Sequence, residues 1–156
     1  MIAALYIKRF APEDIKEVVD LEKRAFPVGP YTREELDLAF SSSGSFNFLL
    51  YDNDTHNLLG YVVATEIDRL TANIESIAVD PDIEGKGAGS VLLKYIEDEM
   101  MARGYKVSTL EVREKNDRAI EFYKKKGYQM LEVVNDFYQL SFKGSKHALR
   151  FIKKLS

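Results

Sequence analysis

The spacing of apolar residues changes soon after the chain begins. Residues 3–10 form a short apolar stretch that predicts a first strand. After Pro12, apolar residues recur every three or four positions as far as Phe26, which predicts an amphipathic helix with proline in its first turn. The run Phe-Pro-Val-Gly-Pro then breaks this helix. Thr32, followed three positions later by Glu35, has the pattern of a capping box and predicts a second, shorter helix.

Strand-like runs dominate the middle of the chain. Residues 46–51 and 58–67 are separated by a polar turn and predict an antiparallel hairpin. Residues 73–79 predict the next strand. A glycine-rich segment at 85–89 follows and runs into an amphipathic helix, which Gly104 is expected to end.

The last third of the chain adds one more helix and three strands. Residues 107–112 predict a strand, and Asn116 or Asp117 is expected to cap the helix that follows. Residues 128–134 and 147–155 predict two final strands on either side of a long turn region. The resulting order is β-α-α-β-β-β-α-β-α-β-β, which predicts an α/β fold with a mixed sheet and helices on both faces.

Length and composition favour one soluble domain. The 156 residues suit a single domain over residues 1–156, and no repeat or linker divides them. The apolar fraction is 46% and the charged fraction 30%, as in soluble globular proteins. No apolar run approaches the roughly 18 residues of a membrane span, and the N-terminus turns polar too soon for a secretory signal. We therefore expect a cytoplasmic protein without a membrane partner.

The composition also excludes several kinds of chemistry. There is no cysteine, so disulfides, thiolate metal sites and a cysteine nucleophile are excluded. The only histidines, His56 and His147, lie far apart in the sequence, so we expect neither a metal site nor a Ser-His-Asp triad. The formal net charge of −3 argues against nucleic acid as the main partner.

The glycine-rich turn at 84–90 reads Glu-Gly-Lys-Gly-Ala-Gly-Ser and lies between a predicted strand and a predicted helix. Glycines allow the backbone to approach a ligand closely, and the first turn of a helix favours an anion. The segment is not a P-loop, because no Gly-Lys-Ser/Thr closes the pattern, and its spacing and mid-chain position fit the dinucleotide-binding fingerprint poorly. The alternative is a turn that only starts a helix.

Three segments together resemble a known family. They are Ile-Ala-Val-Asp-Pro at 77–81, the glycine-rich turn, and residues 110–128, which include Leu-Glu-Val-Arg-Glu-Lys-Asn. They closely resemble the GNAT superfamily of N-acetyltransferases, and the resemblance extends over residues 3–155. It implies a mixed, mostly antiparallel sheet whose central strands splay apart, with acetyl-CoA as cosubstrate in the gap and no metal.

The resemblance also implies a binding site for acetyl-CoA. Glu84 departs from the glutamine or arginine usual in the family, but pyrophosphate is held mostly by backbone N–H groups. We therefore expect a rearranged side-chain contact there, with Lys86 keeping a positive charge beside the phosphates. The residues implied are Ile77, Ala78, Val79, Glu84, Gly85, Lys86, Gly87, Ala88, Gly89, Ser90, Asn116, Phe122 and Tyr123. Core packing is an equal alternative for Phe122.

The resemblance assigns the catalytic roles as well. Tyr123 is the implied general acid for the CoA thiolate, and a phenol suits this because its reference pKa lies above that of a thiol. Glu111 is the implied general base, acting through water, and Glu75 is a second candidate. The alternative for Tyr123 is a core aromatic. The alternative for Glu111 is a strand carboxylate paired with Arg113 or Lys106.

Within the superfamily, the chain is most similar to RimI-like N-terminal acetyltransferases. The similarity lies in residues 110–119, in the loop at 26–31, and in the aromatic segment that precedes the last strand. It implies protein or peptide N-termini as substrates, including ribosomal proteins and nascent chains. The implied acceptor-binding residues are Phe26, Pro27, Val28, Tyr31 and Tyr138. Transfer to a lysine side chain or a small amine is one alternative, and a non-catalytic acyl-CoA-binding module is another.

Overall fold

A computed structural model describes residues 4–156. Ala3, the first residue of the predicted opening strand, lies outside the described residues. The predicted order of strands and helices is confirmed throughout the described part. The elements are β1 (Leu5–Arg9), a 3-10 turn (Pro12–Asp14), α1 (Ile15–Ala25), α2 (Arg33–Ser41), β2 (Ser45–Asp52), β3 (Leu58–Glu66), β4 (Thr71–Val79), a 3-10 turn (Pro81–Ile83), α3 (Ala88–Ala102), β5 (Val107–Arg113), α4 (Asp117–Lys125), β6 (Gln129–Val134) and β7 (Ala148–Lys154).

Local side-chain hydrogen bonds fix several element boundaries. The predicted capping box begins α2: the Thr32 hydroxyl accepts the Glu35 N–H at 3.2 Å, and the Glu35 carboxylate accepts the Thr32 N–H at 3.0 Å. Asn116 caps α4 by accepting the Ala119 N–H at 3.2 Å. Strand β4 starts two residues before its predicted start, because the Asp68 side chain accepts the Leu70 and Thr71 N–H groups and makes the preceding turn tight.

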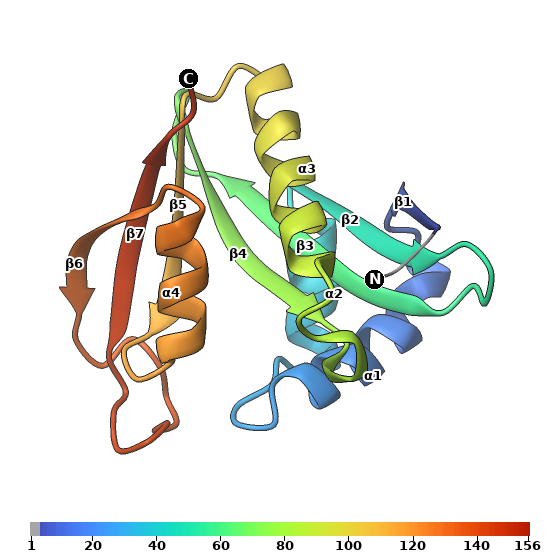
Figure 1. Cartoon of the computed structure of the whole chain (residues 1–156), viewed down its shortest axis with the longest axis horizontal. Coiled ribbons are helices and arrows are strands. Elements are labelled where there is room, and N and C mark those ends of the chain that lie inside the picture. Colours follow the sequence, from blue (N-terminus) through green and yellow to red (C-terminus); the bar gives the residue numbers. More distant parts are fainter. Residues whose placement is uncertain (1–3) are drawn as a thin grey trace.

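The strands form one seven-stranded sheet in the order β1-β2-β3-β4-β5-β7-β6. All neighbouring strands are antiparallel except β4 and β5, which are parallel. The predicted fold class, a mixed and mostly antiparallel sheet, is therefore confirmed. In Figure 1, α3 and α4 lie in front of the sheet, and α1 and α2 lie behind it.

The two central strands separate partway along their length. Thr71–Ile74 of β4 pairs with Val107–Leu110 of β5, and beyond these residues the strands diverge (Figure 1). The pairing of β3 with β4 skips one residue at the same point, since Val63 faces Ser76 and Ala64 faces Ile74. Glu75 is thus the extra residue of a β-bulge, which bends β4 where it leaves β5.

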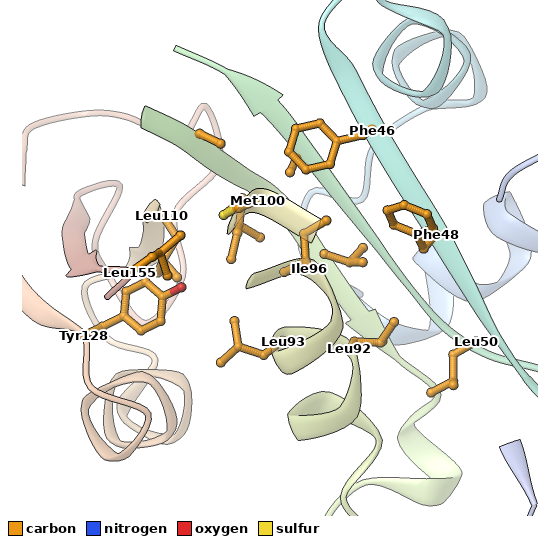
Figure 2. Close-up of a cluster of buried hydrophobic side chains, with 14 of the residues drawn as sticks. Phe46, Phe48, Leu50, Leu92, Leu93, Ile96, Met100, Leu110, Tyr128 and Leu155 are labelled. Carbon is orange, nitrogen blue, oxygen red and sulfur yellow. The ribbon is translucent and has the colours of Figure 1, made fainter. Parts of the chain in front are cut away.

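Two apolar clusters, one on each face, hold the sheet between its helices. Alternate residues of β2 supply both: Phe46, Phe48 and Leu50 face the α3 side, whereas Leu49 and Tyr51 face the α1–α2 side. Figure 2 shows α3 contributing Leu92, Leu93, Ile96 and Met100 to the first cluster. Leu110 of β5 belongs to the same cluster, which therefore joins the two halves of the sheet behind the point where they separate.

Within residues 4–156, no helix combines the length and the apolar character that crossing a bilayer requires.

Candidate active site

A cavity of about 590 Å³ lies at the separation of β4 and β5. One wall is the loop between α1 and α2, the opposite wall is the loop between β6 and β7, and α4 borders the cavity with its first two turns. The cavity brings together nine of the predicted site residues: Phe26, Val28, Tyr31, Glu75, Ile77, Glu111, Asn116, Tyr123 and Tyr138. Pro27 is exposed beside the cavity and does not line it.

The predicted phosphate-binding turn lies outside this cavity, at the start of α3. Gly85 and Gly87 have φ values of +82° and +94°, which favour glycine. A Cβ placed on Gly87 would meet no atom of the described residues within 4 Å, so the space above the turn is open. The first N–H groups of α3 have no partners within the helix. The turn therefore fits a diphosphate group.

Glu84, the residue that departs from the family pattern, has a specific partner. Its carboxylate pairs with Arg118 of α4 at 3.1 Å. A Cβ on Gly85 would lie 4.0 Å from the same guanidinium. The departure at Glu84 is therefore accompanied by an arginine drawn to the turn from another element, and Lys86 lies exposed in the same turn.

The end of β4 and one residue of α4 border the predicted cofactor side. Ile77 and Val79 pack with the α3 cluster, whereas Ala78 is buried in the α1–α2 cluster. Only the main chain of Ala78 can therefore face a cofactor on the α3 side. Phe122 packs against the α3 cluster, and a Cβ on Gly89 would lie 3.6 Å from its ring. Phe122 thus packs in the core, as one of its two expected roles requires, and its ring also borders the glycine-rich turn.

Tyr123 occupies the inner end of the cavity, on α4. Its ring packs edge-on against Phe122 and Tyr128, with centroid distances of 5.1 and 5.7 Å. Burial raises the pKa of the Tyr123 phenol well above its ordinary value. The phenol is consequently protonated at neutral pH and can donate a hydrogen bond into the cavity.

The two candidate bases face each other across the separating strands, and one amide links them. The Asn73 side-chain nitrogen donates to Glu75 Oε1 at 3.2 Å and to Glu111 Oε1 at 3.3 Å. The Thr109 hydroxyl donates to the Asn73 oxygen at 2.6 Å, which fixes the orientation of the amide. Asn73, whose position holds a tyrosine in some members of the superfamily, here holds both carboxylates in place.

The two carboxylates differ in their electrostatic surroundings. Glu111 forms an ion pair with Arg150 of β7, with 2.9 Å between Nε and Oε2. The expected alternative partners Arg113 and Lys106 are therefore wrong: β7 pairs directly with β5 and places Arg150 opposite Glu111. Within residues 4–156 no cationic side chain pairs with Glu75, and burial raises the pKa of Glu75, with the charge of Glu111 adding to the effect.

A buried carboxylate supports the α1–α2 loop, which forms one wall of the cavity. Glu22 of α1 is 2% exposed and accepts the Tyr31 N–H at 2.9 Å. It also accepts a hydrogen bond from the Tyr61 hydroxyl, and burial raises the pKa of its carboxyl. No role for Glu22 is predicted from the sequence. The available signal was a carboxylate on the apolar stripe of an amphipathic helix, where a charge is costly unless it is hydrogen-bonded.

An arginine supports the β6–β7 loop, which forms the opposite wall of the cavity. The Arg113 guanidinium lies over the Tyr138 ring, 4.0 Å from its centroid, and Nη1 donates to the Leu140 carbonyl at 2.9 Å. Burial raises the pKa of Tyr138 to about 12, although the nearby Arg113 charge acts in the opposite direction. Arg113 was considered only as a partner for Glu111, and its contact with the loop 27 residues away has no local sequence signal.

Comparison with known proteins identifies the family. Residues 15–128, more than half of the chain, match the model of the acetyltransferase (GNAT) family. The chain belongs to the GNAT family. The matched region contains both separating strands, the glycine-rich turn and Tyr123.

Two GNAT relatives are similar over most of their length. The [ribosomal protein bS18]-alanine N-acetyltransferase of Escherichia coli (strain K12) is 28% identical over 127 residues, which cover 80% of this chain and 81% of the relative. The crystal structure of the ribosomal-protein-S18-alanine N-acetyltransferase from Escherichia coli has a TM-score of 0.87 at 25% identity, covering 98% of this chain and 95% of that one. The structure of Ard1 from Thermoplasma volcanium has a TM-score of 0.83 at 26% identity, covering 97% and 98%.

The GNAT assignment explains the architecture of the site. The protein is an acetyl-CoA-dependent N-acetyltransferase, with a glycine-rich turn at the start of α3 and a separate cavity between the splayed strands. Among residues 4–156, no group of three or more His, Asp or Glu side chains is arranged to hold a metal ion.

Proposed function

We propose that this GNAT enzyme transfers the acetyl group of acetyl-CoA to the N-terminal α-amine of proteins or peptides. The observation that carries the proposal is the form of the acceptor cavity. Its two walls, the α1–α2 loop and the β6–β7 loop, approach each other at Gly29 and Leu140, where a Cβ on Gly29 would lie 3.6 Å from Leu140. A cavity whose two walls approach each other on one side suits the end of a polypeptide chain. The similarity to the E. coli bS18-alanine N-acetyltransferase and to Ard1 supports the same acceptor class.

Acetyl-CoA would bind along the α3 side of the sheet. Its pyrophosphate would accept hydrogen bonds from the backbone of residues 85–90, and its thioester would reach into the gap between β4 and β5. This arrangement leaves the α1–α2 side of the gap to the acceptor. The two substrates then meet from opposite sides of the sheet in a ternary complex. Because both are already bound, the chemical step no longer includes the entropy cost of bringing them together.

The chemistry is a direct transfer. The neutral amine attacks the thioester carbonyl carbon, so a C–N bond forms and the C–S bond breaks. The amine loses one proton to a carboxylate through water, and the leaving thiolate receives a proton from the Tyr123 hydroxyl. An N-terminal amine has a reference pKa of about 8, against about 10.4 for lysine, so roughly a tenth of it is already neutral at pH 7. A carboxylate of modestly raised pKa is a sufficient base.

We assign the base role to Glu75 and a supporting role to Glu111. Glu75 has its pKa raised by burial, which makes its carboxylate a better proton acceptor at neutral pH. Glu111 is held by Arg150 on one oxygen and by Asn73 on the other. Since Asn73 donates to both carboxylates, Glu111 and Asn73 together orient Glu75 toward the cavity.

A peptide library that varies the first two residues tests the proposed acceptor. Each peptide carries a free N-terminus and one internal lysine, and mass spectrometry locates the acetyl group. Acetylation of the α-amine supports the proposal, whereas acetylation of lysine alone, or of polyamines and aminoglycosides in preference to peptides, replaces it with another acceptor. Release of free CoA thiol with any amine acceptor separates all these enzymes from a protein that only binds acyl-CoA.

Ribosomal proteins and nascent chains are the protein substrates that this proposal favours. The E. coli relative carries ribosomal protein bS18 in its name, which makes an N-terminal peptide of that kind the first acceptor to assay.

A further inference from the structure

Arg113 occupies a position that the reaction itself does not explain. It is the last residue of β5, two positions after Glu111, and its side chain lines the acceptor cavity. Its guanidinium pairs with neither candidate base among residues 4–156 and contacts the β6–β7 loop instead. There it donates to the Leu140 carbonyl at 2.9 Å and lies 4.0 Å from the centroid of the Tyr138 ring and 5.9 Å from that of Phe142. One side chain thus contacts three residues of this loop.

The same guanidinium also meets the opposite wall. A Cβ on Gly29, in the α1–α2 loop, would lie 3.5 Å from Arg113 Nη2 and 3.6 Å from Leu140 Cδ1. Gly29 has φ +68°, so its backbone takes a conformation that brings it against these two side chains. Arg113 and Leu140 therefore form a bridge between the two loops, and the bridge crosses one side of the cavity.

We infer that Arg113 is a positioning residue that closes one side of the acceptor cavity and thereby makes the enzyme select a chain terminus over an internal lysine. This inference rests on the proposed N-terminal acceptor. A terminal residue passes the bridge with one backbone segment, whereas an internal lysine brings a chain that continues in both directions against it. Arginine suits this task because its planar guanidinium can stack on a ring and at the same time donate hydrogen bonds in its own plane, which lysine cannot do.

The bridge also keeps Tyr138 in place as an acceptor wall. Stacking by Arg113 fixes the ring plane of Tyr138, and the bond to Leu140 fixes the main chain two residues later. Loss of the guanidinium leaves the walls present but unordered. The expected defect therefore appears in acceptor binding and acceptor choice and leaves acetyl-CoA binding unaffected.

The test compares Arg113→Ala with Arg113→Lys on a peptide that carries a free N-terminus and one internal lysine. The matched control is Arg103→Ala, because Arg103 also stacks on a ring, 4.4 Å from the centroid of Phe46, and pairs with a carboxylate, Glu99, outside the cavity. For Arg113→Ala we expect the peptide KM to rise on the order of tenfold, since a charged hydrogen bond and a cation–π contact are lost. The KM for acetyl-CoA stays unchanged, and the ratio of α-amine to lysine acetylation falls. Arg113→Lys keeps the charge but loses the planar guanidinium, so its peptide KM and its acetylation ratio should lie between those of the wild type and of Arg113→Ala.

Each remaining outcome decides the question. An unchanged peptide KM and an unchanged acetylation ratio in Arg113→Ala overturn the inference, as does a defect that Arg103→Ala shares. If Arg113→Ala does not fold by thermal melting, Arg113→Lys is decisive, because a wild-type ratio in that variant rejects the role of the guanidinium. A wild-type enzyme that modifies only lysines would instead reject the proposed function, which separates that failure from failure of the Arg113 role.

Discussion

Arg118 and Glu84 form an ion pair of 3.1 Å that joins the first turn of α4 to the glycine-rich turn before α3. Both side chains are largely exposed, so the pair contributes only about 0–1 kcal/mol to folding. Its importance concerns the cofactor: Glu84 adds a negative charge where phosphates are expected, and Arg118 neutralises it.

Removing one partner of this pair is the first test. Arg118→Ala should weaken acetyl-CoA binding severalfold, because the charge of Glu84 then acts on the phosphates without compensation. The double variant Glu84→Gln/Arg118→Ala should recover most of the affinity. Calorimetric titration of CoA at low and at high salt gives both affinities and the electrostatic share. Equal affinity in all variants at low salt would show that the phosphates bind elsewhere.

Gly87 tests the turn itself. Gly87→Val places a side chain in the open space where the diphosphate is expected, so CoA affinity should fall strongly. Gly104→Val is the matched control, since Gly104 has nearly the same φ, +93°, and equally open surroundings at the other end of α3. Both variants introduce the same backbone strain, but only Gly87→Val should lower the affinity for CoA. A folded Gly87→Val protein with normal CoA affinity would disprove this site.

Tyr123→Phe separates catalysis from binding. The substitution should lower kcat on the order of a hundredfold while acetyl-CoA affinity changes little, because the hydroxyl acts on the leaving thiolate. Tyr128→Phe removes a neighbouring buried hydroxyl that bonds Ser108 at 2.8 Å and Glu97 at 2.9 Å. That control should lower stability and spare kcat. Near-normal turnover of Tyr123→Phe under conditions where chemistry is rate-limiting would remove the phenol from the acid role.

Glu75 gives a prediction about pH. Because its pKa is raised above 4.5 in the folded state, the native protein holds more protons there than the unfolded chain. Its contribution to stability is therefore complete at low pH and is lost as pH rises from 4.5 through the raised pKa. Thermal melting of Glu75→Gln between pH 4.5 and neutrality should lack this decline relative to wild type.

The same substitution tests the assignment of the base. The kcat/KM of Glu75→Gln at neutral pH should fall more than that of Glu111→Gln. The reverse order would make Glu111 the base and Glu75 its support.

Tyr138 tests the acceptor wall directly. Tyr138→Ala should raise the KM for peptide and leave the KM for acetyl-CoA nearly unchanged, because Tyr138 belongs to the β6–β7 loop, which is the proposed wall for the acceptor. An equal loss for both substrates would indicate general unfolding. Loss for neither would place the acceptor elsewhere.

The sequence predicted those parts of the molecule that local signals determine. The capping box at Thr32 and Glu35 and the cap at Asn116 involve residues three positions apart, and both are present. Nine of the residues that line the cavity were predicted through the family resemblance. In contrast, Arg150 meets Glu111 across 39 positions, and Glu22 meets Tyr61 across the same separation. Such contacts depend on strand order and register, which no local pattern encodes.

The bulge at Glu75 acts as a frame shift in the pattern of side chains along β4. Before it, the even-numbered Ala72 and Ile74 face α3, and after it the odd-numbered Ile77 and Val79 do. If β4 kept its length but lost the bulge, simple alternation would turn Ile77 and Val79 toward α1 and direct Ala78 into the α3 cluster. The strand would then reach the glycine-rich turn in the wrong phase. The extra residue at position 75 therefore keeps Ile77 and Val79 on the α3 side by its place in the backbone, whatever side chain it carries.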